Sequence, residues 1–412
     1  MTTTVTAGTN LGATVAAIAD QLSDPAVIGT SEDGRTHPQS LAGGAAGIAL
    51  LHLERAVSGH GDEALAHRWI RAAAAGPVST GTAANLFAGA PALAMLLHNA
   101  STSLGGYQRA VAALHEQTII LTRHRLATAH ARIAAETPLT MREFDLIHGL
   151  TGLGVYHLRH HPDQPITHEV LNYLIRLTAA RSDTAGRPPW WLNAGLGGTP
   201  HDRFPNGHGN LGIAHGMSAV TALLALAILA DQRPPGILDA LARLCAWFDQ
   251  HRQTDDVTGT SWWPAYITDG QVAATPHRPS WCYGTAGTAR AQQLAGLALD
   301  DAVRSRRAEA AMVTALTDPH QQAPLPEPGL CHGKAGLLQA AWRTTTSSTN
   351  PHLATQLTTA IPEIADALAR QLAVAPPDTP ELMDGTAGAA LALHTAHTGA
   401  CLTNWDAYLL LA

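Results

Sequence analysis

The sequence predicts an all-α protein whose helices form an α/α toroid, with seven inner helices inside seven outer ones. A pattern of small residues, Gly-x-x-Gly or Gly-x-x-Ala, returns seven times along the chain. Each copy opens a helix that is apolar on nearly every side, as a buried helix is. Amphipathic segments lie between the copies. Such an alternation is typical of a ring of helical hairpins.

The seven copies are spaced 45 to 68 residues apart, enough for one helical hairpin each. Their first residues are Gly44, Gly89, Gly149, Gly216, Gly284, Gly333 and Gly385. Small residues let crowded inner helices approach closely, and glycine adds turn conformations that residues with a Cβ avoid. We therefore expect all seven turns to gather at one end of the barrel.

Seven amphipathic segments are expected to form the outer ring. They span residues 11–23, 62–75, 107–126, 168–180, 237–251, 300–316 and 352–374. Few alternating β-branched runs occur, so little sheet is expected. The alternative is an open solenoid of helix pairs, which would lack a central pocket. Because the toroid accounts for the chain from Leu11 onward, we expect a single domain over residues 1–412.

Composition narrows the class of protein. The chain has 412 residues, of which 14% are charged, and a formal net charge of -7, which argues against a nucleic-acid partner. Four cysteines are too few for a disulfide framework. The N-terminus lacks the features of a signal peptide, and the most apolar stretch, residues 219–230, is too short to span a bilayer. We expect a soluble cytoplasmic protein with free thiols and no transmembrane segment.

Two glycine patterns carry metal-binding side chains directly ahead of the glycine. Cys282 stands in Ser-Trp-Cys-Tyr-Gly at residues 280–284, and Cys331 and His332 stand in Gly-Leu-Cys-His-Gly at residues 329–333. A glycine-flanked turn frees adjacent residues to face one ion, and the helix N-terminus that follows favours thiolates. Two cysteines and a histidine suit a zinc ion with one open position. Alternatively, both cysteines are buried apolar residues and His332 is a core histidine.

Polar residues at matching positions of other copies are candidates for catalysis. His215 precedes Gly216 and could exchange a proton near neutral pH. Asp145, in a neighbouring copy, could orient a histidine, and Arg278 could stabilise a developing oxyanion. The alternative for each of the three is a polar side chain that caps a helix or pairs within a loop.

These motifs together resemble those of the lanthionine synthetase C-like family, the lanthipeptide cyclases. The resemblance rests on residues 212–216, 280–284 and 329–333, supported by Asp-Leu-Ile-His-Gly at residues 145–149. It implies one zinc ion with the ligands Cys282, Cys331 and His332. It also implies His215 as acid/base and Asp145, Arg278 and Tyr283 as further active-site residues. The sequence departs from the family pattern at His148, where an acidic residue often precedes the glycine.

The resemblance implies a cyclase of lanthipeptide (lantibiotic) biosynthesis. Its substrate would be a dehydrated precursor peptide, whose cysteine thiols add in a Michael-type reaction to dehydroalanine or dehydrobutyrine and form thioether rings. A lanthipeptide dehydratase and an export transporter are further candidate partners. A zinc-dependent protein of the same fold that binds glutathione or a partner's cysteine is the alternative. Toroidal prenyltransferases would require an aspartate ligand, and a glycosidase a pair of carboxylates.

Overall fold

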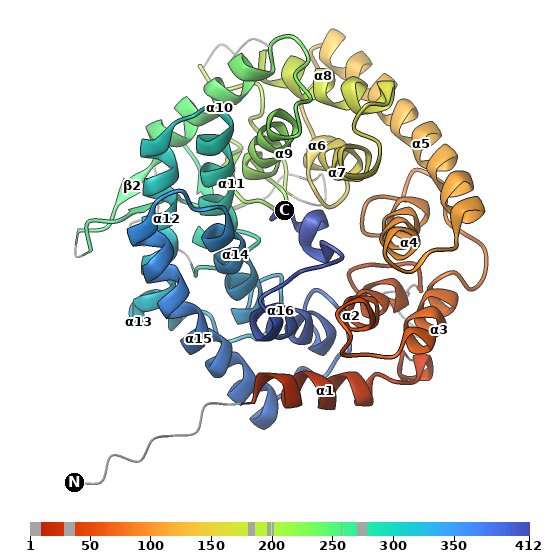
Figure 1. Ribbon diagram of the computed structural model, residues 1–412. Helices are drawn as coiled ribbons and strands as arrows, with labels where there is room; N and C mark the ends of the chain where they lie inside the picture. Colours follow the sequence, from red (N-terminus) through yellow and green to blue (C-terminus); the bar gives the residue numbers. More distant parts are fainter. Residues whose placement is uncertain are drawn as a thin grey trace, which may run out of the picture.

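The computed structural model has two concentric rings of helices (Figure 1) and describes residues 10–28, 38–179, 186–195, 199, 202–256, 258–269 and 278–412. The outer ring consists of α1 (Leu11–Gln21), α3 (Glu63–Ala73), α5 (Gln108–Ala134), α8 (Pro165–Ala179), α10 (Ile237–His251), α12 (Ala302–Thr317) and α15 (Pro351–Val374). The inner ring consists of α2 (Ala45–Val57), α4 (Ala90–Leu104), α7 (Leu150–His160), α9 (Met217–Leu229), α11 (Thr285–Ala298), α14 (Lys334–Ser347) and α16 (Thr386–Thr398). The predicted toroid is thus confirmed.

The ring is closed, which excludes the open solenoid. Helix α1 packs against α15 and α16, and α16 packs against α2. Backbone hydrogen bonds also join successive turns at one end of the barrel. The Cys282 N–H donates to the Cys331 carbonyl (3.1 Å), the Cys331 N–H to the Met383 carbonyl (2.9 Å), and the Met383 N–H to the Ala42 carbonyl (3.1 Å). The last turn is therefore tied to the first.

Secondary structure outside the two rings is short. Four one-turn helices occur among the described residues: η1 (Pro25–Val27), α6 (Met141–Phe144), α13 (Pro319–Gln322) and η2 (Trp405–Leu409). The described strands form two antiparallel pairs, β1 (Gly209–Asn210) with β4 (Tyr266–Ile267), and β2 (Gln253–Thr254) with β3 (Ser261–Trp262). Helix α5 runs beyond its predicted end at residue 126. No described helix has both the length and the apolarity needed to cross a lipid bilayer.

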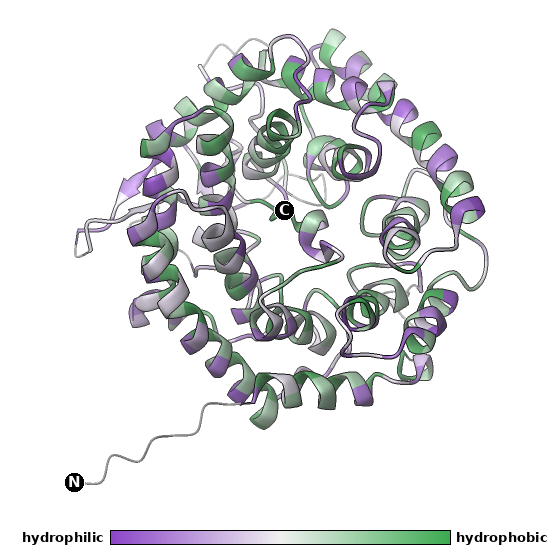
Figure 2. Cartoon of the chain, viewed as in Figure 1, coloured by the Kyte–Doolittle hydropathy of each residue, from purple (hydrophilic) through white to green (hydrophobic). Residues whose placement is uncertain are grey.

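Hydropathy separates the two rings as the sequence predicts. In Figure 2 the inner helix α9 is hydrophobic throughout, whereas the outer helix α5 alternates between hydrophilic and hydrophobic faces. Helix α9 is buried along nearly its whole length, from Met217 to Ile228. A helix with no polar face is stable only between other helices, so the inner ring depends on the outer ring that covers it.

The second glycine of the repeated pattern is required by close packing. A Cβ on Gly388 would lie 1.8 Å from the Leu382 carbonyl oxygen, and one on Gly336 would lie 2.0 Å from the Leu330 carbonyl oxygen. The expectation that the first glycine supplies an unusual backbone conformation is wrong for six of the seven copies, whose φ angles are negative. Only Gly89 has a positive φ, 77°. Glycine is needed in these turns mainly because a Cβ would not fit, and less because of an unusual backbone conformation.

The Gly388→Ala substitution is therefore expected to destabilise the fold by about 1–3 kcal/mol, the usual cost of overpacking. The added methyl group meets backbone, which cannot turn away as a side chain can. Urea denaturation followed by circular dichroism measures the change. Gly81→Ala is the matched control, because a Cβ on Gly81 meets nothing within 4 Å. Equal stability of the two variants would contradict the packing argument.

The C-terminal segment fills the centre of the ring, where Figure 1 marks the end of the chain. Helix η2 and the residues after it are buried. The Trp281 indole Nε1 donates to the Leu409 carbonyl (3.0 Å), and the buried Arg290 guanidinium donates twice to the Leu411 carbonyl (2.8 and 3.0 Å). These contacts anchor the turn next to Cys282 to the interior of the toroid.

Five histidines pack against one another where α5 meets α4 and α7: His98, His115, His157, His160 and His161. Burial, together with the neighbouring imidazoles, lowers the pKa of His157 to about 3 and that of His161 to about 4. Burial disfavours the charged form of an imidazole. These two side chains therefore stay neutral when the protein is folded at neutral pH.

The protein is accordingly expected to lose stability as the pH falls from about 7 toward 4. Unfolded histidine takes up a proton near pH 6.5, whereas folded His157 does not, so His157 alone costs about 2 kcal/mol between pH 7 and pH 5. Urea denaturation at each pH measures this. The His157→Gln variant should show a shallower pH dependence. The exposed His124 lies on the same α5, and His124→Gln should keep the wild-type slope.

Candidate active site

Three predicted metal ligands meet at the end of the barrel where the glycine turns gather. Cys282 lies in the turn before α11, and Cys331 and His332 lie in the turn before α14. Each of them offers one ligand atom within 4.8 Å of the other two. Cys282 is buried, whereas Cys331 and His332 are partly exposed. The group is thus held by the core on one side and accessible on the other.

The two thiols interact strongly with each other. Hydrogen bonds with Cys331 and then with His332 lower the pKa of Cys282, although burial acts in the opposite direction. The hydrogen bond with Cys282, and then burial, raise the pKa of Cys331. One thiol of the pair therefore ionises easily, and the second resists because it would place two negative charges side by side. A divalent cation would remove that conflict.

These donors fit a zinc ion. Two thiolate sulfurs and one imidazole nitrogen are a common zinc ligand set, and three protein ligands leave a fourth position open. The Cys282 hydrogen bond also raises the pKa of His332, against the effect of burial. In the metal-free protein the Cys282 thiolate thus gains from protonated His332 part of the charge neutralisation that a cation would supply.

A second group of polar side chains lies at the same end of the toroid. The His215 Nδ1 is 2.6 Å from the Asp145 Oδ2, and the His148 Nδ1 is 3.3 Å from the same oxygen. The other oxygen of Asp145 accepts hydrogen bonds from the backbone N–H groups of His148 (2.7 Å) and Gly149 (2.8 Å). The carboxylate is therefore fixed by its own turn and reaches across to the neighbouring repeat.

Asp145 is ionised in this setting. Burial opposes its ionisation, but hydrogen bonds from His148 and His215 outweigh burial and lower the pKa of Asp145. Its side chain is fully buried, and that of His215 is 13% exposed. The Asp145 Oδ2, 2.6 Å from the His215 Nδ1, fixes the orientation of the imidazole. His215 is thus placed to accept a proton and to give it up on its exposed side.

Tyr283 lies between the two groups. It follows Cys282 in the chain, and its ring centroid is 6.2 Å from that of His215. Burial raises the pKa of Tyr283, so its hydroxyl remains a hydrogen-bond donor. On the other side its ring centroid lies 5.3 Å from that of Tyr266, which strand β4 positions by pairing with β1.

Arg278 lies near the predicted metal ligands and pairs with Glu327. Its Nη1 is 3.6 Å from the Glu327 Oε2, and both side chains are more than a third exposed. The positive charge of Arg278 lowers the pKa of Cys331 and of His332, although it is a minor influence on each. A pair this exposed can separate at low energetic cost, so Arg278 can move toward a bound ligand.

Two residues of this region, Asp384 and His148, were not among the predicted site residues. The Asp384 Oδ1 lies 3.5 Å from the His332 Nδ1, and His148 shares the Asp145 carboxylate with His215. Asp384 precedes Gly385 as His332 precedes Gly333, so the repeat pattern held a hint of its position. That hint could be used only once the seventh turn was known to pack against the sixth, as the hydrogen bond between Cys331 and Met383 shows.

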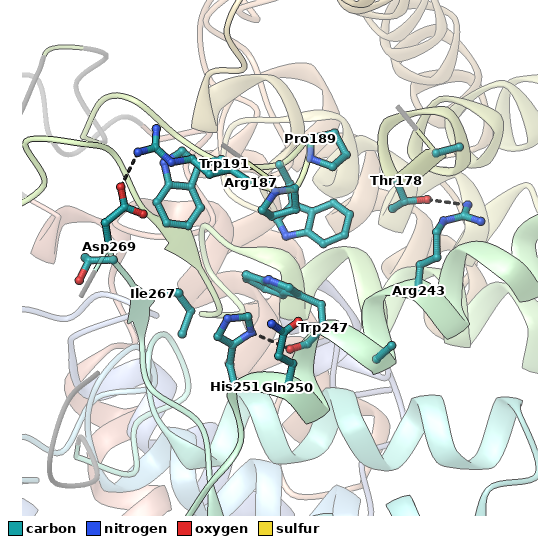
Figure 3. Close-up of a pocket in the computed structure, with 16 residues that line it drawn as sticks. Thr178, Arg187, Pro189, Trp191, Arg243, Trp247, Gln250, His251, Ile267 and Asp269 are labelled. Atoms are coloured by element: carbon teal, nitrogen blue, oxygen red, sulfur yellow. Dashed lines mark hydrogen bonds and ion pairs between the residues drawn. The ribbon is translucent and has the colours of Figure 1, made fainter. Parts of the chain in front are cut away.

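A groove lies elsewhere, beside helices α8 and α10 of the outer ring (Figure 3). It measures about 650 Å³ and lies between α8, α10 and strand β4. Trp191, Trp247 and Arg243 line it together with the Arg187–Asp269 ion pair. None of the predicted site residues lines this groove. This groove is therefore separate from the predicted site. The predicted site is identified by the chemistry of its side chains instead.

The protein is a closed ring of helical hairpins, and a cluster of thiol and imidazole side chains lies at one end of the ring. These two features define its class. The sequence matches the family model of the lanthionine synthetase C-like proteins over residues 35–410. The chain therefore belongs to the lanthionine synthetase C-like family.

Individual relatives agree with this assignment. The nisin biosynthesis protein NisC of Lactococcus lactis subsp. lactis is 24% identical over 211 residues, so that the match spans about half of either protein (49% of each). The solved structure of a nisin cyclase aligns with a TM-score of 0.77 and 18% identity, covering 98% of this chain and 96% of that one. At such low identity the structural likeness establishes the fold alone.

Proposed function

We propose that this protein is a zinc-dependent lanthipeptide cyclase, an enzyme of lanthipeptide antibiotic biosynthesis. It would add cysteine thiols of a dehydrated precursor peptide to dehydroalanine or dehydrobutyrine and so form lanthionine or methyllanthionine rings. The observation that carries the proposal is the juxtaposition of Cys282, Cys331 and His332 with the His215–Asp145 pair at one end of the toroid. Family membership supports the same activity.

In this proposal Cys282, Cys331 and His332 hold the zinc ion, and the open side of the cluster admits the substrate thiol. Bound zinc lowers the pKa of that thiol while the two thiolate ligands keep the substrate sulfur electron-rich enough to attack. The new carbon–sulfur bond forms at the β-carbon, and the π electrons move onto the amide oxygen as an enolate. For the enolate to return to the amide, the α-carbon must then take up one proton.

We assign that proton to His215. Asp145 stabilises protonated His215 through its Nδ1, so that the other ring nitrogen can deliver the proton. Arg278 and the Tyr283 hydroxyl are assigned to the enolate oxygen, where a charge and a hydrogen bond stabilise it. The proton lost by the thiol balances the one delivered by His215, so the addition needs no co-reactant.

Counting free thiols tests the proposal. Zinc-loaded protein mixed with a dehydrated precursor peptide should consume peptide thiols at unchanged peptide mass, because ring formation is an isomerisation. Thiol loss should require zinc and His215. Stable binding of the peptide without thiol loss would contradict the proposal and favour a thiol-binding protein of the same fold.

The Asp384→Asn substitution is expected to weaken zinc binding by about 10- to 100-fold. A carboxylate beside a ligating histidine orients the ring and strengthens it as a donor, and Asp384 lies 3.5 Å from the His332 Nδ1. Competition with a chromophoric chelator measures the affinity. The exposed Asp378 lies in the same connection between α15 and α16, so Asp378→Asn is the matched control. Equal affinity in the two variants would rule out a role for Asp384.

The remaining proposals concern the domain organisation, the cellular location and the partners of the protein. We propose that residues 1–412 form one domain that works in the cytoplasm, where reducing conditions would keep the ligands Cys282 and Cys331 as free thiols. A lanthipeptide dehydratase and an export transporter are proposed as partners. Copurification of each with the protein, with and without precursor peptide, tests these contacts.

A further inference from the structure

Three side chains converge on one point beside the proposed zinc centre. One carboxylate oxygen of Asp145 and one imidazole nitrogen each of His148 and His215 lie within 4.8 Å of one another. Both Nδ1 atoms face the same oxygen, the Asp145 Oδ2. The two imidazole rings are nearly parallel, at 17°, with centroids 5.7 Å apart. Two histidines and a carboxylate are a frequent ligand set for divalent transition ions.

We propose that Asp145, His148 and His215 form a second cation site, which takes a divalent ion such as zinc or cobalt. Ligands about 2.1 Å from a tetrahedral zinc ion lie about 3.4 Å apart. The 3.3 Å separation of Asp145 and His148 already fits this geometry. The 2.6 Å separation of Asp145 and His215 must open by about 0.8 Å, a small turn of one ring.

The surrounding structure prepares the site. Two backbone N–H groups hold the Asp145 Oδ1, which leaves the Oδ2 for a cation. Arg125 from the outer helix α5 donates to the carbonyls of His148 and Ala84 and so fixes the turn. Solvent can reach the site, because the His148 side chain is 28% exposed. The positive charge of Arg125 opposes a cation, so this site binds more weakly than the cysteine-containing centre.

Occupation of this site has a consequence that rests on the proposed function. When the His215 Nδ1 binds an ion, the ring can no longer carry the extra proton that the reaction needs. Zinc beyond one equivalent therefore inhibits ring formation. His148 supplies the added nitrogen.

Counting ions tests the proposal without reference to activity. Metal-free full-length protein is titrated with Co²⁺, and equilibrium dialysis gives the number of ions bound. Thiolate-to-cobalt absorption reports the cysteine centre alone. Wild type should bind two ions. His148→Gln should bind one and keep the thiolate absorption, and Cys331→Ala should bind one and lose it.

One bound ion in a wild type that shows thiolate absorption, or equal numbers of ions in wild type and His148→Gln, would overturn the second site. If the His148→Gln variant fails to fold, the Cys331→Ala variant tests the second site instead. It should bind one ion if the second site exists and none if it does not. The two proposals fail separately. Without a zinc centre, wild type shows no thiolate absorption, yet the ion that is lost in His148→Gln still reports the second site.

Discussion

Replacing Cys331 with alanine is expected to abolish zinc binding at the cysteine centre, and ring formation with it. Two ligands remain, and a tetrahedral site built on one thiolate and one imidazole lacks the charge to hold the ion. The loss should exceed the about 10- to 100-fold that follows removal of a residue behind a ligand. Thiolate-to-cobalt absorption after cobalt substitution, which reports the cysteine centre alone, and the rate of thiol loss measure the two effects.

Cys245→Ala is the control for this experiment. Cys245 is also a buried cysteine, but it lies in the core on α10, and burial raises the pKa of its thiol to about 11. Such a thiol stays protonated and is a poor ligand. The Cys245→Ala variant should keep its zinc at some cost in stability. If both variants retained equal zinc, the assignment of Cys331 would be wrong.

The architecture could be predicted because its cause is local. Five of the seven turns have a second glycine, where a Cβ would strike the carbonyl six residues earlier, as Gly336 and Leu330 show. A steric requirement of this kind recurs in every copy where helix and turn meet as closely. Hydropathy then separates inner from outer helices. In a row of seven similar units, the apolar faces at the two ends are buried when the row closes into a ring.

The site was predictable only in part, because its contacts cross between repeats. The sequence places Asp145 four residues before its glycine and His215 directly before the glycine of the next copy, and their side chains lie 2.6 Å apart. Asp384 stands at such a position too, but its place beside His332 depends on how the last two turns pack. The C-terminal helix η2 has no periodicity that predicts it. Its apolar side chains are buried only because the closed ring surrounds them.

The His215→Asn substitution is expected to slow ring formation by about 10²- to 10⁴-fold, the usual contribution of a general acid or base. Zinc content should stay at the wild-type level at one equivalent, because His215 is not among the ligands of the cysteine centre. Separate assays of zinc and of thiol loss therefore distinguish this variant from Cys331→Ala, which loses both.

The Asp145→Asn variant separates the acid from the residue that positions it. Asparagine keeps a hydrogen-bonding group next to the His215 Nδ1 but removes the charge of the carboxylate. The rate should fall less than in His215→Asn, because the imidazole is still present and only its partner has changed. His124→Asn, exposed on α5, is the control for histidine loss. A wild-type rate in His215→Asn would show that the proton comes from another group.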